Sequence, residues 1–216
     1  AQLPNGILLL TRANFNSPSV VISGYIQSGS LFDTDEKLGL ADFTASALMR
    51  GSTLRDFQQI YDALESCGAS LSFSAGSHTA GFSGRSLAED LPLLLGILSE
   101  VVRQPTFPSG QVEKLRAQLL TGLAIRAQDT ADMAALTFDQ ILFAGHPYGR
   151  PEDGFPETIQ AIRRQDLVDF HRQSYGPRGM VIAIVGAVES QGAMEQVQRV
   201  LGDWNNAGQP DPPPLP

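Results

Sequence analysis

The sequence predicts an α+β fold of two layers, in which a mixed, mostly antiparallel sheet is covered by helices. Three observations carry this prediction. Short β-branched or alternating runs cluster early in the chain, helical periodicity dominates its middle, and one apolar run returns near residue 180. Early strands followed by helices and one late strand are typical of a sheet with helices on one side.

Five segments have the composition of strands, because they are short and rich in apolar, β-branched or aromatic residues. The two segments that follow Gly68 are separated by a turn, which predicts an antiparallel pair. The last segment is almost purely apolar, and this predicts a central strand that is covered on both faces. The expected strands are residues 7–10, 19–27, 69–75, 79–86 and 180–188.

Eight further segments have the apolar spacing of helices. Gly51 and Gly68 follow two of these segments as stop signals, and Pro105 ends a third. The expected helices are residues 38–49, 55–66, 88–103, 110–128, 131–143, 155–162, 164–175 and 191–204. Of these, residues 155–162 are short enough to form a turn instead.

The length and composition allow one packed domain, or two small lobes that share a core. The chain has 216 residues, of which 42% are hydrophobic. We expect residues 1–206 to form the domain. Residues 207–216 are rich in proline, which favours an extended, semi-rigid linker toward a missing C-terminal domain.

Charge and cysteine usage limit the partners and the compartment. The formal net charge is -8 and the sequence pI is about 4.8, so a nucleic-acid partner is not expected. No segment approaches the ~20 apolar residues that cross a bilayer. Cys67 is the single cysteine, which excludes a disulfide framework. These features fit a soluble protein of the cytoplasm or the periplasm.

The polar residues form no familiar catalytic or cofactor motif by themselves. His78, His146 and His171 lie far apart, and none forms the i, i+4 pair that a helical zinc site requires. Neither a phosphate-binding glycine loop nor a Gly-x-Ser-x-Gly turn is found. Adjacent carboxylates such as Glu152 and Asp153 are explained better by solvated loops than by acid–base catalysis. No cofactor is expected.

Six short motifs, in the same order, resemble those of the insulinase/pitrilysin family of zinc peptidases, including its mitochondrial processing peptidase branch. Each motif is moderately specific, and the set of six in order is more specific than any one of them. The motifs are residues 23–30 (SGYIQSGS), 39–41 (GLA), 50–52 (RGS), 64–71 (LESCGASL), 146–149 (HPYG) and 175–180 (YGPRGM). The resemblance covers about the first 190 residues and implies half of a peptidase subunit.

The metal motif of that family is missing from its expected place. The family has His-x-x-Glu-His between the second and third motifs, where this chain has Asp42, Ala45 and Ser46. A further glutamate about 76 residues on completes the family's site, and that count leads from Ser46 to Gly122. Ala45 cannot act as a base and Gly122 has no side chain, whereas Asp42 could contact a cation. Weak metal binding through Asp42 and groups outside this set is therefore an alternative. The resemblance therefore implies that this chain binds no zinc and does not cut peptides by itself.

The resemblance also implies an edge strand that pairs with an extended peptide. The corresponding residues are Ser72, Phe73, Ser74 and Ala75, where the family commonly has Asn-Ala in place of Ser72-Phe73. Phe73 either narrows the cleft or fills the vacated metal pocket, or it is an ordinary core residue.

Three functions are consistent with this pattern. The first is a non-catalytic subunit that, with a homologous catalytic subunit and its own C-terminal half, forms a chamber and holds peptide substrate. The second is a structural or assembly subunit, as in the respiratory-complex core proteins that resemble this family. The third is an enzyme with another apparatus, because Asp42 and Ser46 lie one helical turn apart and a histidine brought close by folding could act as base.

Overall fold

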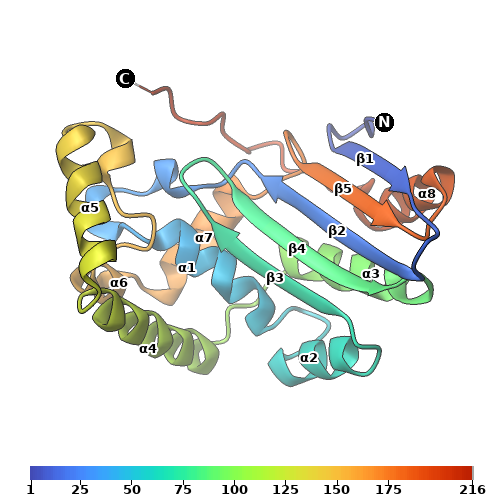
Figure 1. Ribbon diagram of the computed structural model, residues 1–216, viewed down its shortest axis with the longest axis horizontal. Helices are drawn as coiled ribbons and strands as arrows, with labels where there is room; N and C mark the ends of the chain where they lie inside the picture. Colours follow the sequence, from blue (N-terminus) through green and yellow to red (C-terminus); the bar gives the residue numbers. More distant parts are fainter. Residues whose placement is uncertain (216) are drawn as a thin grey trace.

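The computed structural model describes residues 1–215, in which a single five-stranded sheet lies against a layer of helices (Figure 1). Its order is β1-β5-β2-β4-β3. β1 and β5 are parallel, whereas every other neighbouring pair is antiparallel. The strands are β1 (Leu8–Ala13), β2 (Ser19–Ile26), β3 (Ser70–Ala75), β4 (Ala80–Leu87) and β5 (Val181–Gly186). The predicted mixed, mostly antiparallel sheet is confirmed.

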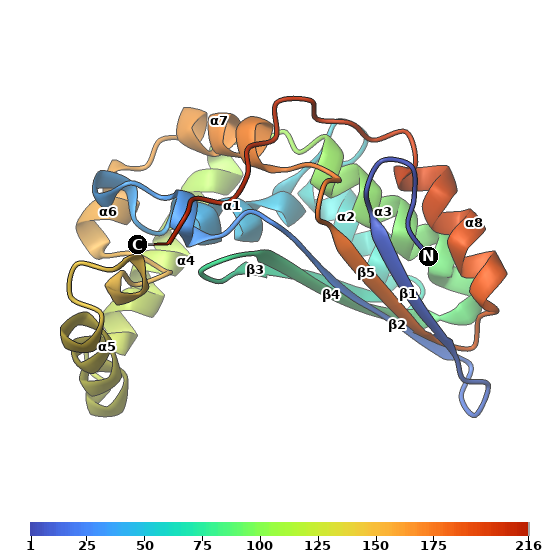
Figure 2. The same ribbon diagram turned by 90° about the horizontal axis from the view of Figure 1, so that it is seen from above.

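The helices cover one face of this sheet (Figure 2). They are α1 (Leu40–Ala47), α2 (Phe57–Glu65), α3 (Leu91–Arg103), α4 (Ser109–Arg126), α5 (Thr130–Leu142), α6 (Pro156–Ala161), α7 (Arg164–Ser174) and α8 (Ser190–Leu201). α1 packs on β3 and is flanked by α4 and α7, while α8 packs on α3 and β1. α5 projects from this layer. No helix of residues 1–215 combines the length and apolar character needed to cross a membrane.

The core lies between the helices and the inner face of the sheet. Alternate strand residues point to this face, because side chains in a strand alternate between its two sides. Val20 and Ile22 of β2 and Ile182 and Ile184 of β5 are fully buried there. The helices contribute long apolar side chains to the same core, with Leu94, Leu95, Ile97 and Leu98 of α3 among them.

The prediction that residues 180–188 form a strand covered on both faces is wrong in one respect. The strand exists, but it is second from the edge of the sheet and only its inner face is covered. Val185 is 41% exposed, and Val181 and Ala183 on the same side are only partly buried. An apolar run predicts a strand but does not reveal whether a second layer covers its outer face.

The open face of the sheet has two chemically different halves. On β1, β5 and β2 it carries large apolar side chains, and on β3 and β4 it is mostly small and polar. The apolar half includes Leu8, Leu10, Val21, Tyr25, Val181 and Val185, while the polar half includes Ser70, Ser72, Ser74 and Ser83.

The start of the predicted linker packs against the domain. Gln209 is buried, its side-chain oxygen accepts from the Arg178 amide at 3.1 Å, and its Nε2 donates to the Arg178 carbonyl at 3.0 Å. Asp211 forms an ion pair with the same arginine at 3.1 Å. The proline-rich segment is therefore anchored at its beginning, and Pro216 lies outside the described residues.

We expect neighbouring residues of β5 to differ sharply in their contribution to stability. Ile184→Ala removes a fully buried side chain and should lower the free energy of unfolding by about 2–5 kcal/mol. Val185→Ala, on the open face, should lower it by less than about 1 kcal/mol. Urea unfolding of both variants measures this, and equal losses would mean that the outer face is also covered.

Candidate functional site

The site expected from the sequence is built around α1, and Asp33 fixes where that helix begins. The Asp33 carboxylate accepts hydrogen bonds from the backbone amides of Gly39 and Ala41, each at 3.0 Å. Gly39 has a φ of 90°, a conformation that favours glycine and turns the chain into the helix. Asp33 is only 4% exposed, and this burial raises its pKa to about 7 although the two amide bonds act in the opposite direction.

One face of α1 belongs to the core and the other faces a cavity. Phe43 and Ala45 are fully buried, and the Arg116 guanidinium of α4 lies over the Phe43 ring at 5.2 Å. Asp42 and Ser46 are half-buried. Ser46 follows Asp42 by four positions, so the two lie on the same side of the helix.

The Asp42 carboxylate joins α1 to the edge strand of the sheet. Its Oδ1 accepts from the backbone amide of Ala75, at the end of β3, at 3.3 Å. Burial raises the pKa of Asp42, the bond from Ala75 lowers it, and the nearby carboxylates of Asp153 and Glu152 raise it further. Asp42 therefore carries a negative charge less readily than an exposed aspartate does.

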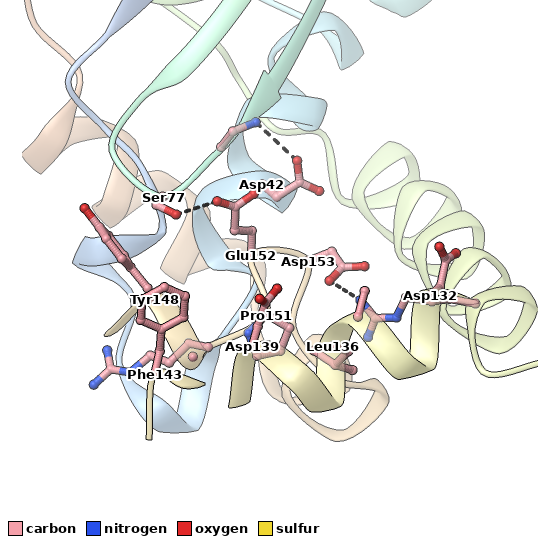
Figure 3. A pocket seen from close by; sticks show the side chains of 15 residues that line it. Asp42, Ser77, Asp132, Leu136, Asp139, Phe143, Tyr148, Pro151, Glu152 and Asp153 are labelled. Atoms are coloured by element: carbon pink, nitrogen blue, oxygen red, sulfur yellow. Dashed lines mark hydrogen bonds and ion pairs between the residues drawn. The ribbon is translucent and has the colours of Figure 1, made fainter. Parts of the chain in front are cut away.

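Asp42 and Ala75 line a cavity of about 660 Å³ with strongly acidic walls (Figure 3). Ser77 donates a hydrogen bond to Glu152 at 2.5 Å across its rim. The guanidinium of Arg126 in α4 forms an ion pair with Asp153. The ionisable side chains of the lining are Asp42, Arg126, Asp132, Asp139, Tyr148, Arg150, Glu152 and Asp153.

The residues that follow α5 form the wall of the cavity opposite α1. His146 Nδ1 accepts from the Tyr148 amide at 3.1 Å and so shapes the turn. The Tyr148 hydroxyl and His78 Nε2 share a hydrogen bond of 2.7 Å, which ties this turn to the β3–β4 turn. His171 lies elsewhere, hydrogen-bonded to the Val102 carbonyl at 2.9 Å.

The four positions that the family resemblance places at the zinc site do not all reach this cavity. Asp42 lines it, whereas Ala45 is fully buried in the core. Ser46 lies one turn after Asp42 and is not part of the lining. Gly122 is exposed on α4, and a side chain added there would meet no atom within 4 Å.

The four residues expected to bind peptide form an edge strand. β3 pairs with β4 alone and ends the sheet. Ser72 and Ser74 are exposed on the open face. Phe73 points inward, is half-buried, and packs against the core with its ring 6.0 Å from that of Phe82.

The residues at this place do not fit a zinc ion. Zinc in proteins takes three or four nitrogen, sulfur or carboxylate ligands at about 2 Å. Among positions 42, 45, 46 and 122, only Asp42 offers such a group, and it already accepts from Ala75. Within residues 1–215, no three histidine, cysteine, aspartate or glutamate side chains are grouped so that they could hold a metal.

Sequence reasoning identified α1 and β3 but missed the acidic cavity. Glu152 and Asp153 were assigned to a solvated loop, whereas they face Asp42 across the cavity. Sequence reasoning also gives no sign that the carboxylate of Asp33 is buried. The signal that was available is the HPYG motif at residues 146–149, which marks the turn that carries these acids.

Comparison of the sequence with known protein families gives two matches along the chain. Residues 8–151 match the family described as Insulinase (Peptidase family M16), and residues 161–216 match the one described as Peptidase M16 inactive domain. Because the first match covers more than half of the sequence, the chain belongs to the insulinase (M16) peptidase family. The resemblance inferred from the six motifs is thereby confirmed.

Individual relatives place the chain in the same family. It is 29% identical to an uncharacterized zinc protease of Mycobacterium tuberculosis, over 93% of this chain and 46% of the relative. It is 26% identical to the mitochondrial-processing peptidase subunit beta of Saccharomyces cerevisiae, over 98% and 46% respectively. A crystal structure titled peptidase M16 inactive domain, from Pseudomonas fluorescens, superposes with a TM-score of 0.89 at 26% identity, over 98% of this chain and 52% of that one. The chain spans about half the length of these relatives.

We expect Asp33 to make stability depend on pH. Its folded pKa of about 7 lies above the ~3.9 of an unfolded aspartate. Between these pH values the folded protein therefore binds more protons than the unfolded protein does. The contribution of Asp33 to the free energy of unfolding is full below pH 4 and is lost as the pH rises to about 7. Relative to Asp33→Asn, the wild type should lose stability over pH 4–7 in urea unfolding. A constant difference between the two proteins would contradict the raised pKa.

Proposed function

We propose that this chain is a non-catalytic peptidase-family domain that helps to form a chamber and to hold extended peptide. The observation that carries the proposal is the set of residues at the zinc positions. Asp42, Ala45, Ser46 and Gly122 together supply one carboxylate and no imidazole. A site of this composition cannot hold zinc in the usual way or activate its water.

The packing of α1 supports a domain that is stable without metal. Removing ligands from a metal site normally leaves polar groups without partners, which is costly in a buried place. Here Ala45 has no polar group, and the Asp42 carboxylate accepts a hydrogen bond from the Ala75 amide. Protein contacts therefore satisfy the polar groups at these positions of the helix.

Exposed apolar side chains on α5 support the proposal that a partner binds this domain. α5 directs Asp132, Leu136 and Asp139 toward the cavity, and its opposite side carries Phe138 and Ile141, which are 62% and 73% exposed. Large apolar patches on a surface are typical of interaction sites. The yeast relative is named as one subunit of a processing peptidase. We infer that a homologous catalytic subunit, together with a C-terminal half of the same protein, covers such surfaces.

Peptide holding is supported by the position of β3. An edge strand presents unpaired backbone groups to which an extended peptide can add. The C-terminal end of this strand leads into the acidic cavity at Ala75 and Ser77. A bound peptide is thus held by its backbone and is not placed beside a catalytic metal.

We expect zinc to have no effect on stability. A ligand that binds only the folded state raises stability in proportion to the logarithm of its concentration over Kd. Since α1 offers no zinc site, 100 µM zinc or an excess of EDTA should leave the melting temperature unchanged within about 1 °C. Elemental analysis of the protein should find less than one zinc per ten chains. A stoichiometric zinc content, or peptide hydrolysis that EDTA stops, would contradict the proposal.

Capture of the catalytic partner tests the assembly. We expect the full-length protein to co-purify at micromolar concentration with a homologue from its own organism that has an intact His-x-x-Glu-His motif. Phe138→Ser with Ile141→Ser should reduce the captured amount at least about fivefold, because both remove apolar contact. Leu54→Ser, also on an exposed leucine but outside α5, is the matched control. A full-length protein that stays alone would contradict the proposed role.

A further inference from the structure

The outer edge of β3 has three backbone amides that face away from β4. The bond from the Gly76 amide to the Thr79 carbonyl closes the β3–β4 turn at 2.9 Å. In an antiparallel pair, hydrogen-bonded and non-bonded residues alternate, so Ser74, Ser72 and Ser70 pair with β4. The amides of Leu71, Phe73 and Ala75 therefore point outward, where an added strand would bind.

These three amides are not equivalent. The Ala75 amide donates to the Asp42 carboxylate at 3.3 Å. Among residues 1–215, no acceptor is found for the outward amides of Leu71 and Phe73. Asp42 comes from α1, which packs against β3. The free edge is thus open along most of its length and closed at its last residue.

We propose that Asp42 determines where a bound peptide strand ends, by occupying the Ala75 amide so that the peptide pairs with Leu71 and Phe73 and stops there. This inference rests on the proposed peptide-holding function and assigns it a specificity-determining residue. In a zinc-binding relative of this family the corresponding position is a histidine of the metal motif, which is committed to the ion. In this chain the same position acts on the strand edge instead.

The surroundings of Asp42 explain why a substitution at this position should break the hydrogen bond to the Ala75 amide. Asp42 forms no ion pair with a basic side chain in the described part of the chain. Asp153 and Glu152 repel its charge. The single hydrogen bond to Ala75 is therefore the main attraction that holds the carboxylate at the strand edge, and a side chain without an acceptor should release the amide.

The test uses a fluorescein-labelled dodecapeptide, (Thr-Val-Thr-Lys)3, and fluorescence anisotropy with the full-length protein. Asp42→Ala frees the Ala75 amide for the peptide, so the Kd should fall roughly two- to tenfold, as one added hydrogen bond allows. Alanine is a better helix former than aspartate, so α1 is retained, and circular dichroism checks this. Asp42→Asn keeps an acceptor oxygen without the charge, and its Kd should stay within about twofold of the wild type.

Each outcome decides between the alternatives. Equal or weaker binding by Asp42→Ala overturns the role of Asp42 but leaves the peptide-holding function intact. If Asp42→Asn and Asp42→Ala bind the peptide equally tightly, and both more tightly than the wild type, then the charge of Asp42 weakens binding and its occupation of the Ala75 amide does not. This result also overturns the inference. Absence of binding to the wild type and to Asp42→Ala overturns the shared premise and the inference with it.

A second measurement needs no peptide and no variant for its first step. In nuclear magnetic resonance, the Ala75 amide shift of the wild type should follow the titration of the Asp42 carboxyl group. Hydrogen exchange at Ala75 should be at least about tenfold faster in Asp42→Ala than in the wild type, while exchange at Leu71 should not change. An Ala75 amide that neither titrates nor gains exchange would overturn the inference.

Discussion

The attachment of α1 to the sheet is the constraint on which the candidate site depends. Asp33 holds the first amides of the helix, Phe43 and Ala45 bury its inner face, and Asp42 reaches the end of β3. These contacts come from three different segments of the chain. Because they fix both the position and the rotation of the helix, they determine which side chains face the acidic cavity and which lie in the core.

The same contacts show how this peptidase-family fold would remain stable under the proposal that its metal residues are replaced. A buried cluster of imidazole and carboxylate groups would need an ion to offset their desolvation. In the proposed account, Ala45, Ser46 and a single carboxylate stand in place of that cluster, so that no ion is needed, and one hydrogen bond joins Asp42 to Ala75. The sheet keeps its edge strand β3. Under this proposal the domain positions a peptide backbone and does not activate water.

Local patterns in the sequence predicted most of the elements correctly. The β3–β4 pair, the stop at Gly68 with its φ of 63° and the late strand β5 all follow from propensity and periodicity. The single covered face of β5 could not be predicted, because an apolar run looks the same in a strand covered on one side or on two. The assignment of position 42 to the site came from the family motif and stays a prediction.

The partners of that site could not be predicted in the same way. Asp42, Asp132 and Glu152 lie far apart in the sequence and meet only through the packing of α1, α5 and the turn after α5. The Asp42–Ala75 bond also depends on β3 being an edge strand, which the family resemblance implied correctly but which no local pattern within residues 69–75 reveals. The acidic cavity and the Asp42–Ala75 bond depend on contacts between residues far apart in the sequence, so local sequence patterns could not predict them.

Anomalous X-ray diffraction at the zinc edge, on crystals of the full-length protein grown with zinc, tests the central claim most directly. The account predicts no anomalous peak near α1 and an Asp42 carboxylate in contact with the Ala75 amide. A peak beside Asp42, with the carboxylate turned from the strand toward the ion, would contradict it.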